Sequence, residues 1–321
     1  MSSPQPNPSA LRIVSLLPAA TEIVCALGLE GQLVGISHEC DYPASVRGIP
    51  ALTSSKLSTR ATSQEIDLDL RDILRRALAI YDIDSAALQR AEPDVIVTQN
   101  LCEVCAIPLG EVQRAVREFL PRTKLVNLAP TRLADLWSNL DEVAAALGVS
   151  ERAQPLIERL QQRLAKISQR AHSNSRASRP QVLTIESIDP LMVGGLWMPD
   201  LVEIAGGRAL VTQAGEHAPT LSRAALRALS PAPDLVLFKP CGMRLEQSRM
   251  ELGTMRELLA EQTWPALATG NVFLADGNAF FNRPGPRLVE SAEILAALTQ
   301  PDEFEDFAAR HAKSYARLEL G

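Results

Sequence analysis

Cysteines are the residues whose spacing most directly suggests chemistry in this chain, which has five of them: Cys25, Cys40, Cys102, Cys105 and Cys241. Cys102 and Cys105 form a C-x-x-C pair, a spacing that lets two thiolates reach one metal or redox centre. All but Cys25 follow a predicted strand, and converging thiolates suit zinc or an iron–sulfur cluster. The other four cysteines are therefore candidate metal ligands.

A structural role is the alternative for the same cysteines. Cysteine is small and tolerates burial, and a single C-x-x-C pair also arises by chance. Cys25 lies beside Val24 and Leu27 in a helical pattern, so we expect it in the core. His38 could replace one cysteine as a metal ligand, and a redox dithiol is a further use of the C-x-x-C pair.

A second group of residues could hold a large planar ligand. Tyr42, Trp197, Phe280 and Phe281 are expected in loops, although aromatic residues make up only 4% of the chain. An aromatic face contributes about 0.5–1.5 kcal/mol beyond its burial. Arg283, within the stiff sequence RPGPR, could reach a carboxylate, an amide or a phosphate. The alternatives are loop packing for the aromatic rings and a solvated helix start for Arg283.

No catalytic apparatus is recognisable in the sequence. Glu22 and Glu186 lie near the ends of predicted elements and could pair as acid and base, but no third partner completes a mechanism. The chain contains no G-x-S-x-G, H-E-x-x-H or phosphate-binding P-loop motif. We therefore predict a binding protein rather than an enzyme.

Composition restricts the partners and the location. The net charge of −6 and the pI of about 5.4 argue against nucleic acid or an anionic membrane as the main partner. No apolar run approaches the ~20 residues that span a bilayer, so we expect no membrane insertion. The N-terminus lacks the positive charges and the cleavage site of an export signal. We expect a disordered tail over residues 1–10 and a cytoplasmic location.

Apolar runs and helical patterns alternate along both halves of the chain. Predicted strands cover residues 12–17, 34–37, 94–98, 124–127, 181–185, 234–238 and 271–274. Such alternation is typical of parallel α/β sheets. From residue 131 to 172 the pattern is almost continuously helical, although residues 148–150 could bend it and Ser150 followed by Glu151 resembles a fresh helix start. At ~1.5 Å per residue such a helix would reach ~60 Å. We predict an N-terminal lobe at 11–130, an inter-lobe backbone helix at 131–172 and a C-terminal lobe at 180–321.

Several short motifs, in their order and spacing, resemble those of one family. They are SLLPAATE at residues 15–22, PDVI at 93–96, DLVEIAGG at 200–207 and FFNRPGPR at 280–287. In these motifs the chain resembles the cobalamin (vitamin B12)-binding proteins of the iron/B12 periplasmic-binding group, the helical-backbone metal receptors. The resemblance implies a class III periplasmic-binding-protein-like α/β fold: two Rossmann-like lobes joined by a long backbone helix.

The resemblance also implies that a ligand would bind in the cleft between the two lobes. In open α/β sheets, ligands bind at the loops that follow the carboxyl ends of the strands. The corresponding loops here are residues 18–21, 38–43, 99–106, 193–197, 239–243 and 278–283. Within them, the expected ligand-binding residues are Pro18, Tyr42, Gln99, Trp197, Phe280, Phe281 and Arg283.

The expected function is capture of a corrinoid, with cobalamin the foremost candidate, or of a related metal cofactor. The chain departs from the family in its apparent lack of an export signal and in extra residues between 50 and 81. One alternative is a metalloprotein with an iron–sulfur cluster or zinc at Cys40, Cys102, Cys105 and Cys241 and a redox or regulatory role. Another is an exported transporter subunit with an atypical leader. The sequence does not identify a delivery partner.

Overall fold

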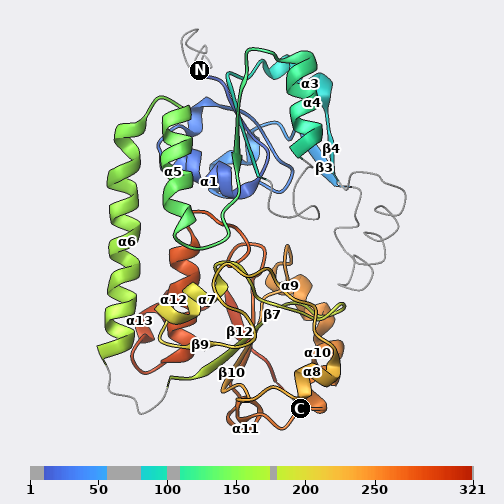
Figure 1. Ribbon diagram of the computed structural model, residues 1–321, viewed down its shortest axis with the longest axis vertical. Coiled ribbons are helices and arrows are strands. Elements are labelled where there is room, and N and C mark those ends of the chain that lie inside the picture. The colour runs from blue at the N-terminus through green and yellow to red at the C-terminus, as the bar shows by residue number, and fades with distance from the viewer. Residues whose placement is uncertain (1–10, 56–80, 100–108, 174–178, 320–321) are drawn as a thin grey trace. The chain divides into compact units, whose positions relative to one another are not determined.

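Two compact units make up the computed structural model of the chain, which we describe over residues 11–55, 81–99, 109–173 and 179–319 (Figure 1). Of these residues, unit 1 comprises 11–55, 81–99, 109–130 and 135–157, and unit 2 comprises 131–134, 158–173 and 179–319. Helix α6 (Ser150–Ser173) contributes residues to both units.

Unit 1 is built on a parallel sheet of four strands in the order β2-β1-β5-β6. Its strands are β1 (Ile13–Ser15), β2 (Leu33–Ile36), β5 (Val95–Gln99) and β6 (Lys124–Leu128). A separate hairpin pairs β3 (Thr53–Ser55) with β4 (Tyr81–Ile83). The apolar runs of β1 and β5 are buried on both faces, as central parallel strands require.

The helices of unit 1 begin where local chemistry favours a start. They are α1 (Pro18–Ala26), α3 (Ser85–Ala91), α4 (Leu109–Phe119) and α5 (Asp135–Ala146). Pro18 occupies the first turn of α1, where its missing N–H is not needed. Asp84 caps α3 by accepting a hydrogen bond from the Ala87 amide at 2.8 Å. Short 3₁₀ turns at Glu30–Gln32 and Ala44–Gly48 complete the unit.

Unit 2 contains a larger sheet in the order β12-β11-β10-β7-β8, with β9 beside β7. Its strands are β7 (Gln181–Ser187), β8 (Met192–Val193), β9 (Arg208–Ala209), β10 (Leu235–Phe238), β11 (Val272–Ala275) and β12 (Tyr315–Arg317). Strands β7, β9, β10 and β11 are parallel, whereas β8 and β12 are antiparallel. The carboxyl ends of β7, β10 and β11 therefore share one edge of the sheet.

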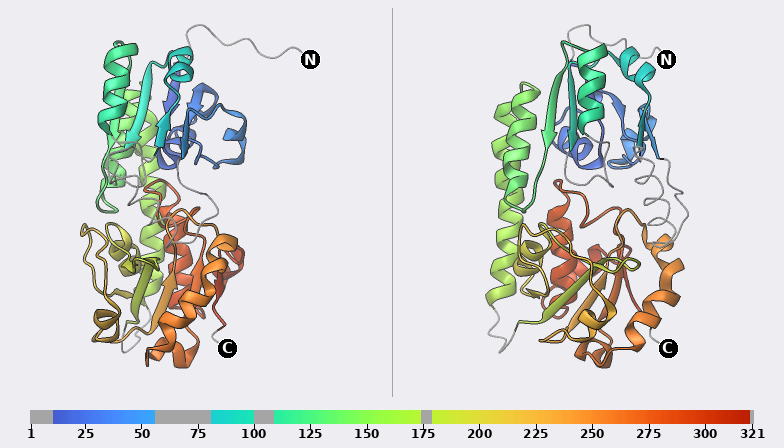
Figure 2. Two further views of the ribbon diagram at one scale, coloured as in Figure 1. Left: turned by 90° about the vertical axis from the view of Figure 1, so that its right-hand side faces the viewer. Right: turned by 45° about the vertical axis from the view of Figure 1, so that its right-hand side comes forward.

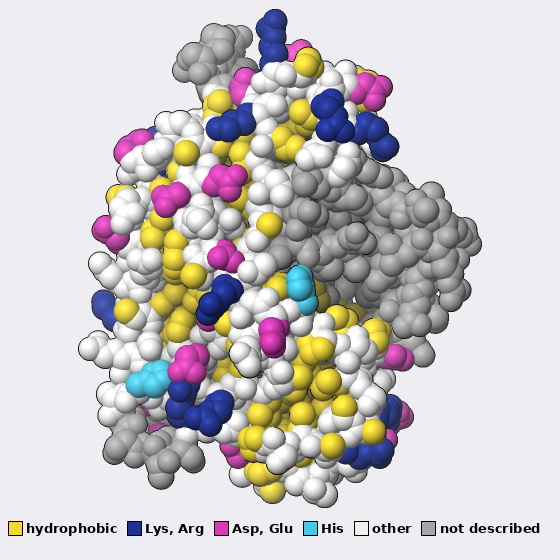
Figure 3. Space-filling view, viewed as in Figure 1, with side chains coloured by type: hydrophobic (Ala, Val, Ile, Leu, Met, Phe, Trp, Pro, Cys, Tyr) yellow, Lys and Arg dark blue, Asp and Glu magenta, His cyan; other side chains and the backbone are white. Residues whose placement is uncertain are grey.

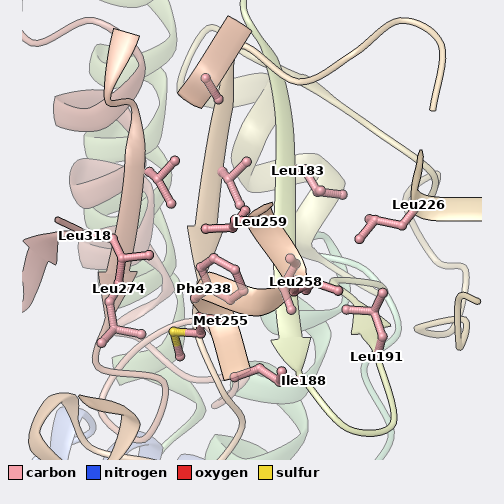
Figure 4. Close-up of a cluster of buried hydrophobic side chains, with 14 of the residues drawn as sticks. Leu183, Ile188, Leu191, Leu226, Phe238, Met255, Leu258, Leu259, Leu274 and Leu318 are labelled. Carbon is pink, nitrogen blue, oxygen red and sulfur yellow. The ribbon is translucent and has the colours of Figure 1, made fainter. Parts of the chain in front are cut away.

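Helices cover both faces of the unit 2 sheet (Figure 2). They are α7 (Met198–Ile204), α8 (Arg223–Arg227), α9 (Leu245–Ser248), α10 (Leu252–Ala260), α11 (Pro265–Thr269), α12 (Leu288–Thr299) and α13 (Glu305–Arg310). Figure 4 shows the core on the α10 face, where Phe238 and Leu183 from the sheet meet Met255 and Leu258 from α10. Helices α7 and α12 lie on the opposite face.

The predicted strands are confirmed, and the almost continuous helix expected over residues 131–172 is two helices that separate at the expected bend. Helix α5 ends at Ala146 and α6 begins at Ser150. Gly148 lies between them with a φ of 71°, a left-handed conformation that ends helices and that glycine adopts without strain. The sequence pattern also predicts a helix at 68–79, but these residues and the tail expected at 1–10 lie outside the described residues. The predicted lobe boundaries stay a prediction.

No helix in the part of the chain that we describe is long and apolar enough to cross a membrane.

Candidate functional site

Buried hydroxyl groups and a thiol form the carboxyl edge of the unit 1 sheet. Thr21, in the first turn of α1, places its Oγ1 2.8 Å from Ser15 Oγ and 3.0 Å from Cys40 Sγ. All three residues are buried. Ser15 ends β1, and Cys40 belongs to the loop after β2. The hydrogen bonds therefore join the loops that follow two neighbouring strands.

His38 extends this polar edge toward the hairpin. Its Nδ1 lies 2.7 Å from Thr53 Oγ1, and its backbone amide donates to the same oxygen at 3.0 Å. Thr53 Oγ1 in turn donates to Ser37 Oγ at 3.2 Å. Burial lowers the pKa of His38, which favours a neutral imidazole at pH 7. Hydroxyl groups and the imidazole of His38 thus connect the loop after β2 with the hairpin.

The ligand-binding residues expected in unit 1 differ in exposure. Pro18 is half-buried at the start of α1, and Gln99 is buried at the end of β5. Tyr42 is 44% exposed and is among the large side chains open to solvent. Residues 100–106, which complete the third expected loop, lie outside the described residues. Tyr42 is the one aromatic side chain of this edge that the structure presents to solvent within the described residues.

A buried ion pair lies at the carboxyl edge of the unit 2 sheet. Lys239 follows β10 directly and is fully buried. Its Nζ lies 2.6 Å from Glu186 Oε2 and donates to Asn282 Oδ1 at 2.8 Å. Asn282 also donates through Nδ2 to the Gly277 carbonyl at 2.7 Å. These bonds connect the ends of β7 and β10 with the segment after β11.

That segment, residues 276–283, is held close to the sheet. Asp276 Oδ1 accepts hydrogen bonds from the amides of Asn278 at 3.1 Å and Ala279 at 2.7 Å. Burial raises the pKa of Asp276, although these bonds oppose the shift. A Cβ atom at Gly277 would lie 2.0 Å from the Pro240 carbonyl oxygen, so only glycine permits this approach.

Trp197 and Phe281 lie in the interior of unit 2 instead of facing solvent. Their exposed fractions are 5% and 1%. Trp197 Nε1 donates to the Phe281 carbonyl at 2.6 Å, and the Phe281 amide donates to Ser291 Oγ at 2.9 Å. Phe281 adopts a φ of 69°, a strained conformation for a bulky side chain. Both aromatic residues therefore hold the backbone of the segment in place.

Phe280 and Arg283 are attached to the same segment. The Phe280 ring is half-buried, makes an edge contact with the ring of His311 and lies under the guanidinium of Arg287. Arg283 is only 8% exposed and donates to Asn278 Oδ1 at 2.9 Å. The alternative of a solvated Arg283 is thus wrong. Phe280 is the expected aromatic residue that retains exposure in unit 2.

The cysteines do not form a metal site among the described residues. Cys102 and Cys105 lie outside those residues, Cys40 is buried in unit 1 and Cys241 is exposed in unit 2. No group of three or more His, Cys, Asp or Glu residues within the described ranges could hold a metal ion. Cys25 is half-buried and not fully in the core, and burial together with Glu30 and Glu22 raises its pKa to about 12. Cys25 is therefore a thiol at neutral pH.

Sequence reasoning missed Lys239 and Asn282 and assigned no role to the hydroxyl groups of unit 1. One signal was available for Lys239, which follows the apolar run LVLF without a turn residue. Thr21 and Ser15 give no comparable signal because isolated hydroxyl residues are common in every environment.

The described residues also form a small cavity and a surface of mixed charge. The cavity, of about 310 Å³, lies beside the turn after β7 in unit 2, with Asp189, Leu221 and Thr254 in its lining. On the face in Figure 3, basic and acidic side chains of the described residues are intermixed, which does not resemble the basic stripe of a nucleic-acid binder.

Comparisons with known proteins agree with this arrangement of strands and loops. A vitamin B12-binding protein of Photorhabdus laumondii is 24% identical over 288 residues, covering 89% of this chain and 86% of that protein. A periplasmic heme-binding protein of Pseudomonas aeruginosa has a similar structure, with a TM-score of 0.68 and 20% identity over 90% of this chain and 92% of that one. The periplasmic vitamin B12-binding protein of Vibrio cholerae superposes with a TM-score of 0.63 and 20% identity, covering 90% and 96%.

These likenesses confirm the class III periplasmic-binding-protein-like α/β fold that the sequence predicts. The sequence profile described as periplasmic binding protein matches residues 13–279, most of the chain. The chain belongs to the periplasmic binding protein family.

Proposed function

We propose that this protein captures a corrinoid, with cobalamin as the foremost candidate, at the carboxyl edges of its sheets. The observation that carries the proposal is the family match over residues 13–279, together with curated relatives that are vitamin B12-binding proteins. The protein acts by reversible binding and not by catalysis.

The carboxyl edge of unit 2 supports this proposal. A ligand site in an α/β fold requires loops whose positions are set before the ligand arrives. The segment of residues 276–283 meets that requirement through Asn282, Asp276 and the Trp197 hydrogen bond to Phe281. Phe280 then offers a half-buried ring on a fixed backbone. In unit 1, Tyr42 offers an exposed ring.

Heme is the second candidate ligand. The structural neighbour from Pseudomonas aeruginosa is a heme-binding protein, and its TM-score is slightly higher than that of the Vibrio cholerae vitamin B12-binding protein. Both ligands contain a large macrocycle with apolar surface that aromatic side chains can contact. Their peripheral groups differ, however, and that difference provides a direct test.

The first experiment is an ultraviolet–visible spectrum of the full chain, purified without oxygen, before and after incubation with cyanocobalamin and removal of unbound ligand. We expect a stoichiometric corrin spectrum to remain with the protein. Parallel incubation with hemin measures the rival ligand. Retention of hemin alone would replace the corrinoid proposal with a heme proposal.

Iron, zinc and sulfide analysis of the same preparation tests the cysteine-based alternative. A brown colour with absorbance near 400 nm would favour an iron–sulfur protein if this absorbance is lost in a Cys102→Ser variant. Cell fractionation tests the cytoplasmic location, which stays a proposal, and recovery from the periplasm would favour an exported transporter subunit.

A further inference from the structure

Glu186 occupies an unusual position at the carboxyl edge of unit 2. Its Oε2 is 2.6 Å from the Lys239 ammonium, which is only 1% exposed, while the Glu186 side chain keeps 20% exposure. The cation therefore lies behind the carboxylate, and solvent reaches the carboxylate. An ammonium held in this way restricts the rotation of its partner carboxylate.

Asn282 completes the support of this ion pair. Its Oδ1 accepts from Lys239 Nζ at 2.8 Å, and its Nδ2 donates to the carbonyls of Gly277 at 2.7 Å and Lys239 at 3.2 Å. Lys239 is a donor only, so Glu186 and Asn282 use its ammonium hydrogens from different elements. Glu186 is consequently a preorganised hydrogen-bond acceptor at the strand ends, where the fold binds ligands.

A carboxylate in a fixed position interacts differently with the peripheral groups of cobalamin and with those of heme. Cobalamin carries neutral carboxamide groups, whose N–H bonds donate to a carboxylate in a charge-assisted hydrogen bond. Heme carries propionate carboxylates, which cannot donate and are repelled by a second negative charge at close range. The same residue can therefore attract one ring and disfavour the other.

We propose that Glu186 is a specificity-determining residue that accepts a hydrogen bond from a peripheral carboxamide of the corrinoid and disfavours carboxylate-bearing rings. Lys239 and Asn282 are positioning residues that hold it in place. This inference rests on the proposed function, because it assigns a role within the same corrinoid site.

The most sensitive probes are ligands that differ only in one amide. Hydrolysis of cyanocobalamin yields separable monocarboxylic acids, each with one carboxamide replaced by a carboxylate. We expect the wild-type protein to bind cyanocobalamin more tightly than at least one of these isomers by roughly 10-fold or more, as for a lost charge-assisted hydrogen bond and an added repulsion. Hemin, with its propionates, is the second probe.

The Glu186→Gln variant keeps the shape and removes the negative charge. We expect its preference for cyanocobalamin over that isomer to fall by roughly 10-fold, and its relative affinity for hemin to rise. Glu261→Gln is the matched control, because Glu261 pairs with Arg223 and Arg227 in unit 2 away from the strand ends. Its ligand preference should equal that of the wild type.

Glu186→Gln leaves the buried Lys239 without its counter-ion, which could destabilise the fold, so a second variant separates this effect from the change in ligand preference. The double variant Lys239→Met with Glu186→Gln removes both charges, and its preference should also fall. Folded variants with the wild-type preference would overturn the role of Glu186 while the corrinoid proposal stands. A wild-type protein that retains no corrinoid would overturn both.

Discussion

At the carboxyl edge of each unit, buried polar side chains connect the loops that follow neighbouring strands, but the two units use different interactions. In unit 1, Thr21 joins Ser15 and Cys40 through a hydroxyl group, and no charge is buried in that group. In unit 2, the fully buried Lys239 pairs with Glu186. Burial of a hydrogen-bonded hydroxyl group costs little free energy. Loss of one partner of a buried ion pair, by contrast, leaves an uncompensated charge and is strongly destabilising. The unit 2 edge is therefore the more vulnerable to substitution.

Thiol reactivity gives the largest expected difference between the two units. Cys25 of unit 1 has a pKa of about 12 instead of 9.0 because of burial and nearby carboxylates. At pH 8 its thiolate fraction is on the order of 1000-fold below that of an unperturbed cysteine. We expect iodoacetamide to label the exposed Cys241 long before Cys25, as measured by peptide mass spectrometry in a Cys102→Ser, Cys105→Ser background.

A Cys241→Ser control in the same background should remove the early-labelled peptide. Labelling of Cys25 as fast as Cys241 would contradict the difference in burial between these two thiols.

Removal of one ion-pair partner gives the next largest effect. Glu186→Ala leaves the Lys239 ammonium buried with Asn282 as its remaining side-chain acceptor, and we expect a loss on the order of 3–5 kcal/mol in the free energy of unfolding. Adding Lys239→Met should recover most of that loss, because no uncompensated charge remains. Urea titration of the single and double variants measures both values.

Glu261→Ala is the matched control for this experiment. Glu261 pairs with exposed Arg223 and Arg227, and such surface pairs contribute about 0–1 kcal/mol. If Glu186→Ala were no more destabilising than Glu261→Ala, the unit 2 edge would not depend on its buried ion pair.

Acid should weaken unit 2 through Glu293 in α12. Burial alone would raise the pKa of Glu293, but hydrogen bonds from His311, Arg163 and Arg310 lower it from 4.5 to about 2. The folded state therefore binds this proton less readily than the unfolded chain. The resulting stability, roughly 3 kcal/mol, is present above pH 4.5 and is lost as the pH falls toward 2.

Urea unfolding between pH 6 and pH 2.5 tests this dependence. Glu293→Gln should have a shallower pH dependence over that range, since it removes the titrating carboxyl group. Identical slopes for the wild type and the variant would exclude Glu293 as the cause.

Loss of one hydroxyl group in unit 1 should have the smallest effect. Thr21→Val removes the hydrogen bonds to Ser15 and Cys40 while it preserves the shape of the side chain. We expect the free energy of unfolding, measured by urea titration, to fall by about 1–2 kcal/mol. Thr21→Ser keeps the hydroxyl group and serves as the control. If Thr21→Val lowered the free energy of unfolding as much as Glu186→Ala does, the proposed difference between the two edges would be contradicted.

The sequence predicts the strands well because their signals are local. Runs such as IVS, VIVT and LVLF combine β-branched or aromatic side chains with complete burial. Residues 85–91 also have a helical pattern that ends before Pro93, and helix α3 has these bounds. Asp84 caps its start. The break between α5 and α6 depends on Gly148, whose left-handed φ is not encoded by the apolar pattern on either side.

The missing parts of the prediction depend on contacts between distant residues. Strand β12 contains Tyr315 and Arg317 without an apolar run and exists because it pairs with β11. Lys239 resembles a solvent-exposed residue in sequence, and only the fold brings Glu186 and Asn282 around it. Trp197 was expected at a ligand, yet its indole N–H bonds to the Phe281 carbonyl far along the chain.

Calorimetric titration of the full chain with cyanocobalamin tests the central claim most directly. We predict stoichiometric binding with a dissociation constant in the micromolar range or below, as expected for a ring enclosed by preorganised loops. The absence of both heat and retained corrin at saturating ligand concentration would contradict corrinoid capture.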